Sequence, residues 1–315
     1  MSKNHVDNGG SMELKNPCNI CPRRCNAVRG ERVGYCGAPD KIYISRASLH
    51  KWEEPPVSGT KGSGTIFFAG CNLRCVFCQN KRISSDSAAF SGAVAVTPEE
   101  LCDIMLRLQD VGAHNINLVT PTHYSLGVIQ ALRSAKPRLN VPVVYNSSGY
   151  ESVETLKRLS GLVDVYLPDL KYFSSELSAR YSGAADYFEV ASAAITEMLS
   201  QVGEPVLEGG LIKRGVIVRH LVLPGCRKDS MNVLRALSEL VPTDKIKLSL
   251  MRQFTPDFVD REKYPELYRK VTTFEYDSVV REAAKLGFDG YVQSSESASA
   301  EYTPTFNCRE AFQLM

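Results

Sequence analysis

The stretch TIFFAGCNLRCVFCQN, residues 65–80, decides how the fold of the whole chain is interpreted. Its apolar run at residues 65–69 predicts a buried strand. Cys71, Cys75 and Cys78 follow that run, with three and then two residues between them. Three thiolates on one short loop can wrap one side of a metal cluster, and thiolate is the ligand of iron–sulfur clusters. Three ligands leave a fourth iron open to a substrate or cofactor; a zinc knuckle or buried free thiols are the alternatives.

This spacing after a strand resembles the signature of the radical S-adenosylmethionine (SAM) enzymes. The flanking residues resemble those of the activating enzymes of glycyl radical enzymes, such as the pyruvate formate-lyase activating enzyme, at Asn72, Leu73, Arg74, Phe77 and Asn80. The resemblance implies a 4Fe-4S cluster on the three cysteines with SAM bound to its open iron. It also implies that reduction cleaves SAM to methionine and a deoxyadenosyl radical, which takes hydrogen from a substrate without a protein base.

Composition bounds the remaining possibilities. The chain has 315 residues and a formal charge of +2, so nothing in its balance favours a nucleic acid as partner. It contains ten cysteines, and we find neither an apolar stretch of signal-peptide length near the N-terminus nor a run long enough to cross a bilayer. We therefore expect a cytoplasmic protein without a membrane partner, in which clustered thiols bind metal.

A second cysteine cluster precedes the first. Its members, with gaps of two, three and ten residues, are Cys18, Cys21, Cys25 and Cys36. Four thiolates suit a closed metal site in a small module that has few large apolar residues, and the spacing leaves zinc and an auxiliary iron–sulfur cluster equally open. Four unligated thiols are the alternative. We divide the chain into a disordered tail (1–16), this cysteine-rich module (17–40), a connecting segment (41–63), the catalytic domain (64–293) and a C-terminal extension (294–315).

Short apolar strands alternate with amphipathic helices through the catalytic domain. Thr97-Pro98-Glu99-Glu100 opens one helix with an N-cap, a proline and a capping-box glutamate. Further strands are expected at residues 116–119, 141–145, 163–167, 216–223, 246–250 and 291–293. Alternation implies parallel pairing, in either a barrel or an open doubly wound sheet. The resemblance favours an α/β fold with a partial barrel of six β/α units, of the TIM type.

Candidate SAM contacts follow the strands, because barrel chemistry sits at the carboxyl ends of the strands. The segment Asp169-Leu170-Lys171 resembles the Asp-Leu-Lys segment with which activating enzymes contact SAM. The Gly-Gly-Glu motif that binds the SAM amine in those enzymes is absent after the second strand, where Thr120, Thr122 or His123 stands instead. We select as cofactor contacts Asp169, Lys171, Asn146, Ser148, Thr122 and Arg219. Alternation along the fifth strand points Arg219 and His220 to opposite faces, so at most one faces the interior.

Three functions remain open. The first is a radical SAM oxidoreductase that activates a glycyl radical enzyme. The second is a radical SAM enzyme that modifies a peptide, an RNA or a small molecule. The third is a non-catalytic iron–sulfur or zinc protein for electron transfer or scaffolding. The first two need a low-potential electron donor, such as flavodoxin or ferredoxin, and the first also needs a protein substrate.

Overall fold

The computed structural model describes residues 17–85, 87–297 and 306 of the chain. The tail at 1–16 lies outside these residues, as does most of the C-terminal extension. Phe306 is the exception, and its ring meets Phe67 edge-on with the two centroids 5.5 Å apart.

One open sheet organises the structure. Its strands run in the order β10-β9-β8-β6-β5-β4-β2-β1-β3, and β7 pairs with β8 outside this path. Neighbours from β2 to β10 along this path pair in parallel, whereas β1 pairs antiparallel with β2 and with β3. The strands are β1 Ile42–His50, β2 Ser63–Phe68, β3 Val94–Val96, β4 Ile116–Val119, β5 Val143–Ser147, β6 Val165–Pro168, β7 Val206–Glu208, β8 Leu211–Leu221, β9 Lys247–Met251 and β10 Gly290–Val292.

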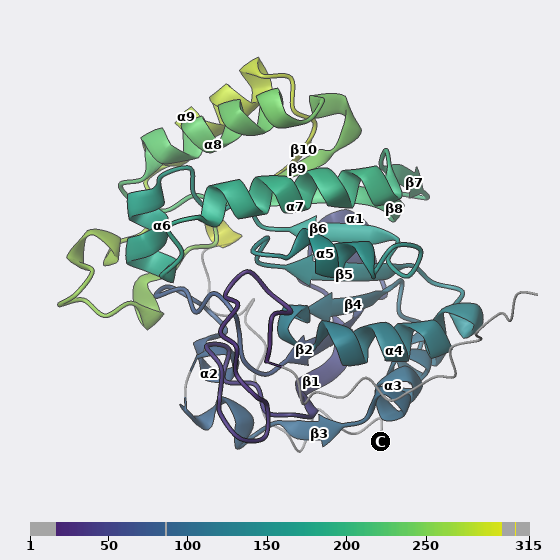
Figure 1. The fold of residues 1–315 in the computed structure, drawn as a ribbon. Coiled ribbons are helices and arrows are strands. Elements are labelled where there is room, and N and C mark those ends of the chain that lie inside the picture. The colour runs from purple at the N-terminus through teal and green to yellow at the C-terminus, as the bar shows by residue number, and fades with distance from the viewer. Residues whose placement is uncertain (1–16, 86, 298–305, 307–315) are drawn as a thin grey trace, which may run out of the picture.

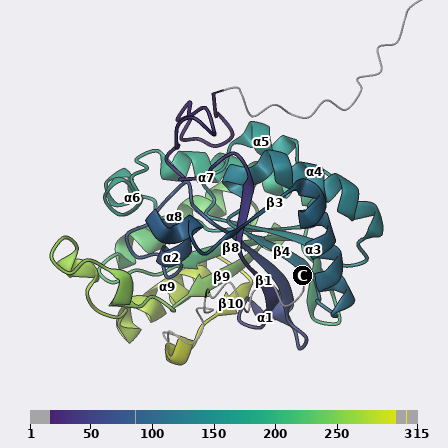
Figure 2. The same ribbon diagram turned by 90° about the horizontal axis from the view of Figure 1, so that it is seen from below.

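Helices cover the outer face of this sheet (Figure 1). Figure 2 shows them as an arc around the strands, from α3 and α4 at one side to α9 at the other. The α-helices are α1 Pro55–Ser58, α2 Lys81–Ser84, α3 Pro98–Asp110, α4 Ser125–Ala135, α5 Val153–Lys157, α6 Ser175–Ser182, α7 Tyr187–Val202, α8 Arg227–Leu240 and α9 Thr273–Lys285. No helix among the described residues is long and apolar enough to cross a membrane.

The elements form where local chemistry favours them. All residues of β2, β5 and β6 are buried, as expected of parallel strands covered on both faces. The predicted capping box at α3 is confirmed: Thr97 Oγ1 accepts from the Glu100 amide at 3.2 Å, and Glu100 Oε2 accepts from the Thr97 amide at 2.8 Å. Both faces of the sheet therefore bury apolar side chains, with a few buried polar residues such as Asn117 and Ser249 inside the strands.

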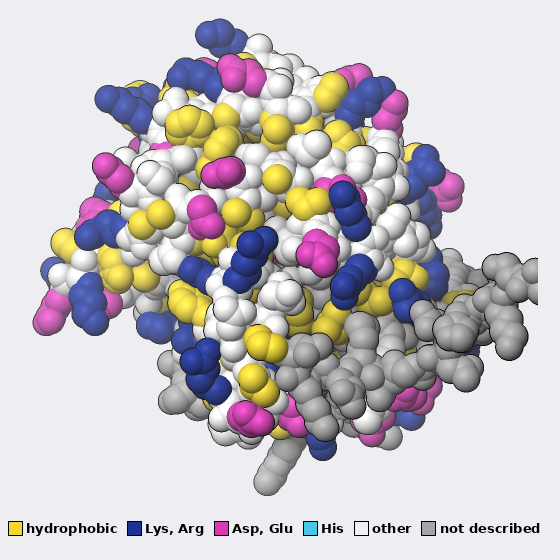
Figure 3. Space-filling model, in the orientation of Figure 1, with side chains coloured by type: hydrophobic (Ala, Val, Ile, Leu, Met, Phe, Trp, Pro, Cys, Tyr) yellow, Lys and Arg dark blue, Asp and Glu magenta, His cyan; other side chains and the backbone are white. Residues whose placement is uncertain are grey.

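The predicted partial barrel is confirmed. Six parallel strands, β2, β4, β5, β6, β8 and β9, correspond to the six expected units, and the short β10 adds a seventh. The connecting segment contains the regular strand β1 at residues 42–50, which pairs along β2. The surface of the face in Figure 3 mixes basic and acidic side chains without a large region of one sign, in keeping with the balanced net charge.

Candidate active site

The cluster loop leaves β2 through a tight turn. Gly70 has φ +88°, and a Cβ at this position would lie 2.6 Å from the Cys36 carbonyl oxygen, so only glycine fits. Beyond it, each cysteine sulfur accepts a hydrogen bond: Cys71 from the Leu73 amide at 3.3 Å, Cys75 from Ser182 Oγ at 3.1 Å and Cys78 from Ser84 Oγ at 3.4 Å. Such bonds favour the thiolate forms that bind iron.

The three cysteines line one cavity of about 210 Å³, which we call the cysteine chamber. Its wall also includes residues from the carboxyl ends of β5, β6 and β8, among them Asn146, Ser148, Asp169, Lys171 and Arg219. A larger, open groove of about 730 Å³ lies outside this chamber, around Cys226 and Asp229, and none of the three loop cysteines lines it. Thiol chemistry and strand-end polar groups therefore meet in the smaller cavity.

Electrostatics in the cysteine chamber suit a bound cluster. Burial raises the pKa of the Cys71, Cys75 and Cys78 thiols, each neighbouring thiolate raises it further, and the Lys171 ammonium lowers it. Iron offsets such a raised pKa, because metal binding drives thiols to thiolates. Among the described residues no three His, Cys, Asp or Glu side chains are placed to share a single metal ion. In a cluster each cysteine binds a separate iron, and the soft donor set fits iron and sulfide.

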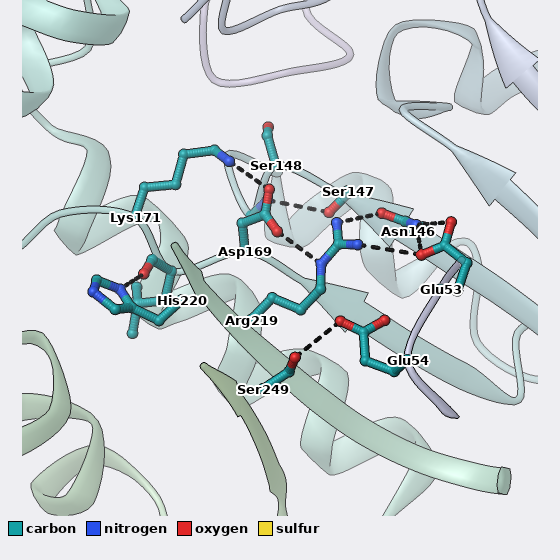
Figure 4. Close-up of polar contacts among 12 residues, drawn as sticks. Glu53, Glu54, Asn146, Ser147, Ser148, Asp169, Lys171, Arg219, His220 and Ser249 are labelled. Carbon is teal, nitrogen blue, oxygen red and sulfur yellow. Dashed lines mark hydrogen bonds and ion pairs between the residues drawn. The ribbon is translucent and has the colours of Figure 1, made fainter. Parts of the chain in front are cut away.

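An ion-pair network holds the predicted SAM contacts together (Figure 4). Arg219 Nε donates to Asp169 Oδ1 at 2.8 Å and Arg219 Nη2 donates to Asn146 Oδ1 at 2.6 Å. Lys171 Nζ donates to the other oxygen, Asp169 Oδ2. Burial alone raises the pKa of the Asp169 carboxyl, but Arg219 and Lys171 outweigh burial and leave the pKa below its ordinary value. A carboxylate and two cations are thus held beside the cysteines.

Backbone geometry brings these residues together. Asp169 and Arg219 form a parallel bridge just beyond the end of β6, and the Leu170 amide donates to the Arg219 carbonyl at 2.8 Å. Gly149 has φ +77°, and a Cβ there would lie 2.1 Å from the Asp169 carbonyl oxygen. The turn after β5 therefore packs directly on the Asp169 segment, which requires glycine at position 149.

The remaining sequence-selected residues separate into two groups. Ser148 lines the cysteine chamber, and its buried hydroxyl oxygen has no partner among the described residues, which suits a ribose hydroxyl or carboxylate. Thr122 differs from expectation: its hydroxyl is buried and donates to Glu151 Oε1 at 2.5 Å, while Thr120 lines the chamber. The chain turns at Thr120, which has φ +59°, and the short 3₁₀ helix Thr122–Tyr124 carries Thr122 away from the chamber. His123 also turns away and bonds the Ala69 carbonyl at 2.8 Å through Nε2.

The alternation predicted for β8 is confirmed. Arg219 faces the cysteine chamber, whereas His220 points to the other face and bonds the Leu170 carbonyl through Nδ1 at 2.7 Å. Burial lowers the pKa of His220 to about 4, so the ring is neutral at pH 7.

Sequence reasoning missed Glu53 and Glu54, which come from the segment between β1 and β2. Glu53 Oε1 accepts from Asn117 Nδ2 at 3.0 Å, and Glu53 Oε2 lies 3.5 Å from Arg219 Nη1. Glu54 Oε1 accepts from Ser249 Oγ at 3.0 Å. Two acidic residues before Pro55-Pro56 give no spacing signal, because their partners lie on β4, β8 and β9.

The N-terminal module packs against the cluster loop. The Cys71 amide donates to the Cys36 carbonyl at 3.3 Å. Arg23 Nε donates to the Asn72 carbonyl at 2.7 Å and Arg23 Nη2 to the Ser182 carbonyl at 2.9 Å, while the Tyr35 ring lies 4.0 Å from the guanidinium carbon. The module has no helix or strand, as its composition predicts.

Within this module, Cys36 lies within electrostatic reach of Cys18, Cys21 and Cys25. Burial raises the pKa of Cys21 to about 12, and neighbouring Cys36 and Cys18 add to the rise. Burial also raises the pKa of Cys36, with further contributions from Cys18 and Cys25. The positions of these thiols do not show that a metal is bound or which metal it is, so the second metal site stays a prediction.

Comparisons with known proteins identify the family of this chain. The radical SAM superfamily profile matches residues 65–209. An uncharacterized protein of Methanocaldococcus jannaschii is 31% identical over 283 residues, which cover 86% of this chain and 75% of that protein. A second uncharacterized protein of this organism is 27% identical over 61% of this chain and 54% of that protein.

Among solved structures, a radical SAM methyltransferase from Sphaerobacter thermophilus has a TM-score of 0.50 and 14% identity, over 76% of this chain and 69% of that one. At this identity the likeness concerns the fold alone.

A partial barrel with three cysteines after its first barrel strand and a polar network at the strand ends defines a class of enzymes that cleave SAM at an iron–sulfur cluster. With the profile and relatives above, the chain belongs to the radical SAM superfamily.

Proposed function

We propose that the chain cleaves SAM reductively and abstracts hydrogen from a separate substrate, with Cys71, Cys75 and Cys78 holding a 4Fe-4S cluster. When bound, the cluster and SAM supply methionine and a deoxyadenosyl radical. One observation carries the proposal: the three thiols share a cavity with the Asp169–Arg219–Lys171 network. The chain's own residues then have to bind SAM, orient it and exclude water.

Each member of the network has a distinct task in this proposal. Lys171 is largely buried and lies close enough to the thiols to affect the pKa of each, so its ammonium stabilises a carboxylate beside the cluster. Asp169 keeps lone pairs free on both oxygens, because each accepts one hydrogen bond from a cation. It can therefore accept from a ribose hydroxyl or an amine. Ser148 offers the unpartnered hydroxyl described above.

Deoxyadenosine formation tests this proposal. The protein is reconstituted anaerobically with iron and sulfide, then incubated with dithionite and SAM. We expect the unaltered protein and Cys226→Ala to form deoxyadenosine, since Cys226 lies outside the cysteine chamber. Cys75→Ala should form none. Absence of product from the unaltered protein would leave only a non-catalytic iron–sulfur or zinc protein.

A second candidate is activation of a glycyl radical enzyme. Its support is the resemblance of Asp169-Leu170-Lys171 to the SAM-contacting segment of activating enzymes, together with the place of Asp169 and Lys171 in the chamber wall. Electron paramagnetic resonance on a co-encoded candidate partner, incubated with the reduced enzyme and SAM, should show a glycyl radical doublet. A partner that stays radical-free while deoxyadenosine forms would favour a peptide, an RNA or a small molecule as substrate.

We further propose that flavodoxin or ferredoxin delivers the electron and that the module at 17–40 binds zinc or an auxiliary cluster. The support for the metal is the spacing of the four cysteines together with the proximity of Cys36 to the other three thiols. Replacing Cys18 and Cys25 together by alanine should remove either zinc or part of the iron and sulfide, measured by elemental analysis. Unchanged metal content would contradict the second site, and equal reduction rates with and without either donor protein would contradict the donor.

A further inference from the structure

A second cavity adjoins the cysteine chamber where the sheet remains open. This cavity of about 380 Å³, the Glu54 chamber, lies between the segment after β1 and the edge formed by β9 and β10. Five residues line both cavities and make the wall between them: Trp52, Glu53, Arg219, Met251 and Gln253. A group bound in the Glu54 chamber is therefore next to the compartment assigned to SAM and the cluster.

Glu54 is the polar group in this chamber with unused bonding capacity. The residue is 9% exposed. Its Oε1 accepts from Ser249 Oγ at 3.0 Å, whereas its buried Oε2 has no hydrogen-bond partner among the described residues. Glu53 differs, because both of its oxygens contact donors on Asn117, Asn146 or Arg219. A buried acceptor without a donor is costly, so a ligand that donates to Glu54 Oε2 gains that energy.

The two permanent cations that line the chambers bond only two of the three carboxyl groups there. The carboxyl groups that line them belong to Glu53, Glu54 and Asp169, and the permanent cations are Arg219 and Lys171. Both cations bond Asp169, and Arg219 also pairs with Glu53. Burial lowers the pKa of His50, at the rim of the cysteine chamber, to about 4, which leaves its ring neutral at pH 7. Of the three carboxyl groups, only Glu54 has no cation within ion-pair distance among the described residues, although burial raises its pKa and the charge of Arg219 partly offsets that rise.

The shape of the free acceptor selects the kind of cation. A guanidinium prefers to bond both oxygens of a carboxylate in parallel, and the Ser249 hydroxyl competes with it for one oxygen of Glu54. An ammonium is a point donor and needs only the free oxygen. Trp52 and Tyr291 add aromatic side chains to the wall, and aromatic faces attract ammonium groups.

We propose that the Glu54 chamber binds a primary ammonium group of the substrate, with Glu54 Oε2 as its acceptor and Ser249 holding the carboxylate in place. This inference rests on the proposed function, because it places the amine beside the SAM compartment. Burial raises the pKa of Glu54, and a bound ammonium offsets that effect by favouring the carboxylate. The substrate class is therefore an amine-bearing molecule.

Binding of small probes to the reconstituted protein saturated with SAM tests the inference. Isothermal titration at pH 7 compares n-butylamine, n-butanol and n-butylguanidine. We expect n-butylamine to bind more tightly than n-butanol, and Glu54→Gln to weaken n-butylamine binding by about tenfold or more, as loss of a charge-assisted hydrogen bond predicts. Glu54→Asp, which keeps the charge, should retain part of the affinity. Glu262→Gln, at an exposed position, is the matched control and should bind like the unaltered protein.

Several results would overturn the inference. The unaltered protein could fail to bind n-butylamine, bind n-butanol as tightly as n-butylamine, or bind n-butylguanidine more tightly than n-butylamine. Glu54→Gln could also keep the full affinity for n-butylamine. Displacement of SAM by n-butylamine would also overturn it, since the amine would then occupy the SAM site. Iron and sulfide content and circular dichroism verify folding, and Glu54→Asp carries the test if Glu54→Gln does not fold. Deoxyadenosine formation, measured separately, reports on the proposed function and distinguishes its failure from failure of this inference.

Discussion

Replacing Asp169 by asparagine should destabilise the chain strongly, because the change removes one charge from a buried network and leaves two cations behind. The side chains of Asp169, Lys171 and Arg219 are 11%, 13% and 14% exposed. Breaking a buried ion pair by removing one partner costs about 3–5 kcal/mol. Arg219 keeps Asn146 Oδ1 at 2.6 Å and Glu53 at 3.5 Å, so we take the lower end, about 3 kcal/mol.

Urea unfolding of the apoprotein, followed by circular dichroism under reducing conditions, measures this difference. With a slope of about 3 kcal/mol per molar urea for a chain of this size, the midpoint should fall by about 1 M. Asp103→Asn, at an exposed position on α3, is the control and should shift it by less than about 0.2 M. SAM affinity, measured in parallel on reconstituted protein, should fall in Asp169→Asn alone.

The pH dependence gives this prediction a sign. The pKa of Asp169 is lower in the folded protein than its ordinary value, so its contribution is fully present above that value and is lost as the pH falls through the folded pKa. The stabilities of Asp169→Asn and the unaltered protein should therefore differ most at neutral pH and converge in acid. A difference below about 1 kcal/mol at pH 7, or a difference that does not shrink in acid, would refute the reasoning.

Three further predictions concern other parts of the site. Cys71→Ala, Cys75→Ala and Cys78→Ala should each lose SAM cleavage and cluster assembly, measured by deoxyadenosine and by iron and sulfide content; full activity in any of them would contradict the ligand assignment. Arg23→Ala should lower iron occupancy and reduce the free energy of unfolding by about 2 kcal/mol, because Arg23 bonds carbonyls of the cluster loop and α6. Arg23→Lys should recover little of either loss, and unchanged iron occupancy in Arg23→Ala would contradict this role. Burial raises the pKa of Glu151 to about 7, so the free energy of unfolding should fall by about 3 kcal/mol between pH 4.5 and 7. Glu151→Gln should show a smaller fall over this range. The same pH dependence of unfolding free energy in both proteins, measured by urea titration, would contradict this prediction.

Residues close together in sequence were predictable as parts of the site. Cys71, Cys75 and Cys78 lie on one loop, so their spacing already indicates that they face the same cavity. Asp169 and Lys171 are two residues apart, and the structure places both in the wall of the cysteine chamber. Strand periodicity also located most barrel strands within two residues, because burial on both faces leaves a continuous apolar run; the exception, β8, begins earlier at Leu211.

Thr122 shows the limit of such reasoning. Its position after an apolar strand matched that of the other strand-end residues, yet the positive φ of Thr120 turns the backbone and sends the Thr122 side chain to Glu151. A single backbone dihedral decides which of two nearby threonines faces the chamber. That dihedral depends on packing around the turn and leaves no pattern in the residue types.

The sequence by itself determined the thiolate loop, the alternation of strands and helices and the sides to which Arg219 and His220 point, because all three depend on neighbours along the chain. Only the tertiary structure decided which distant groups meet. Glu53 and Glu54 reach Arg219 and Ser249 across more than 160 positions because the segment after β1 lies across the opening of the barrel. Glu54 Oε2 is left without a donor among the described residues. Local patterning thus specifies the elements and the candidate metal ligands, while the surroundings of the proposed substrate site depend on how the segment after β1 contacts strands β8 and β9.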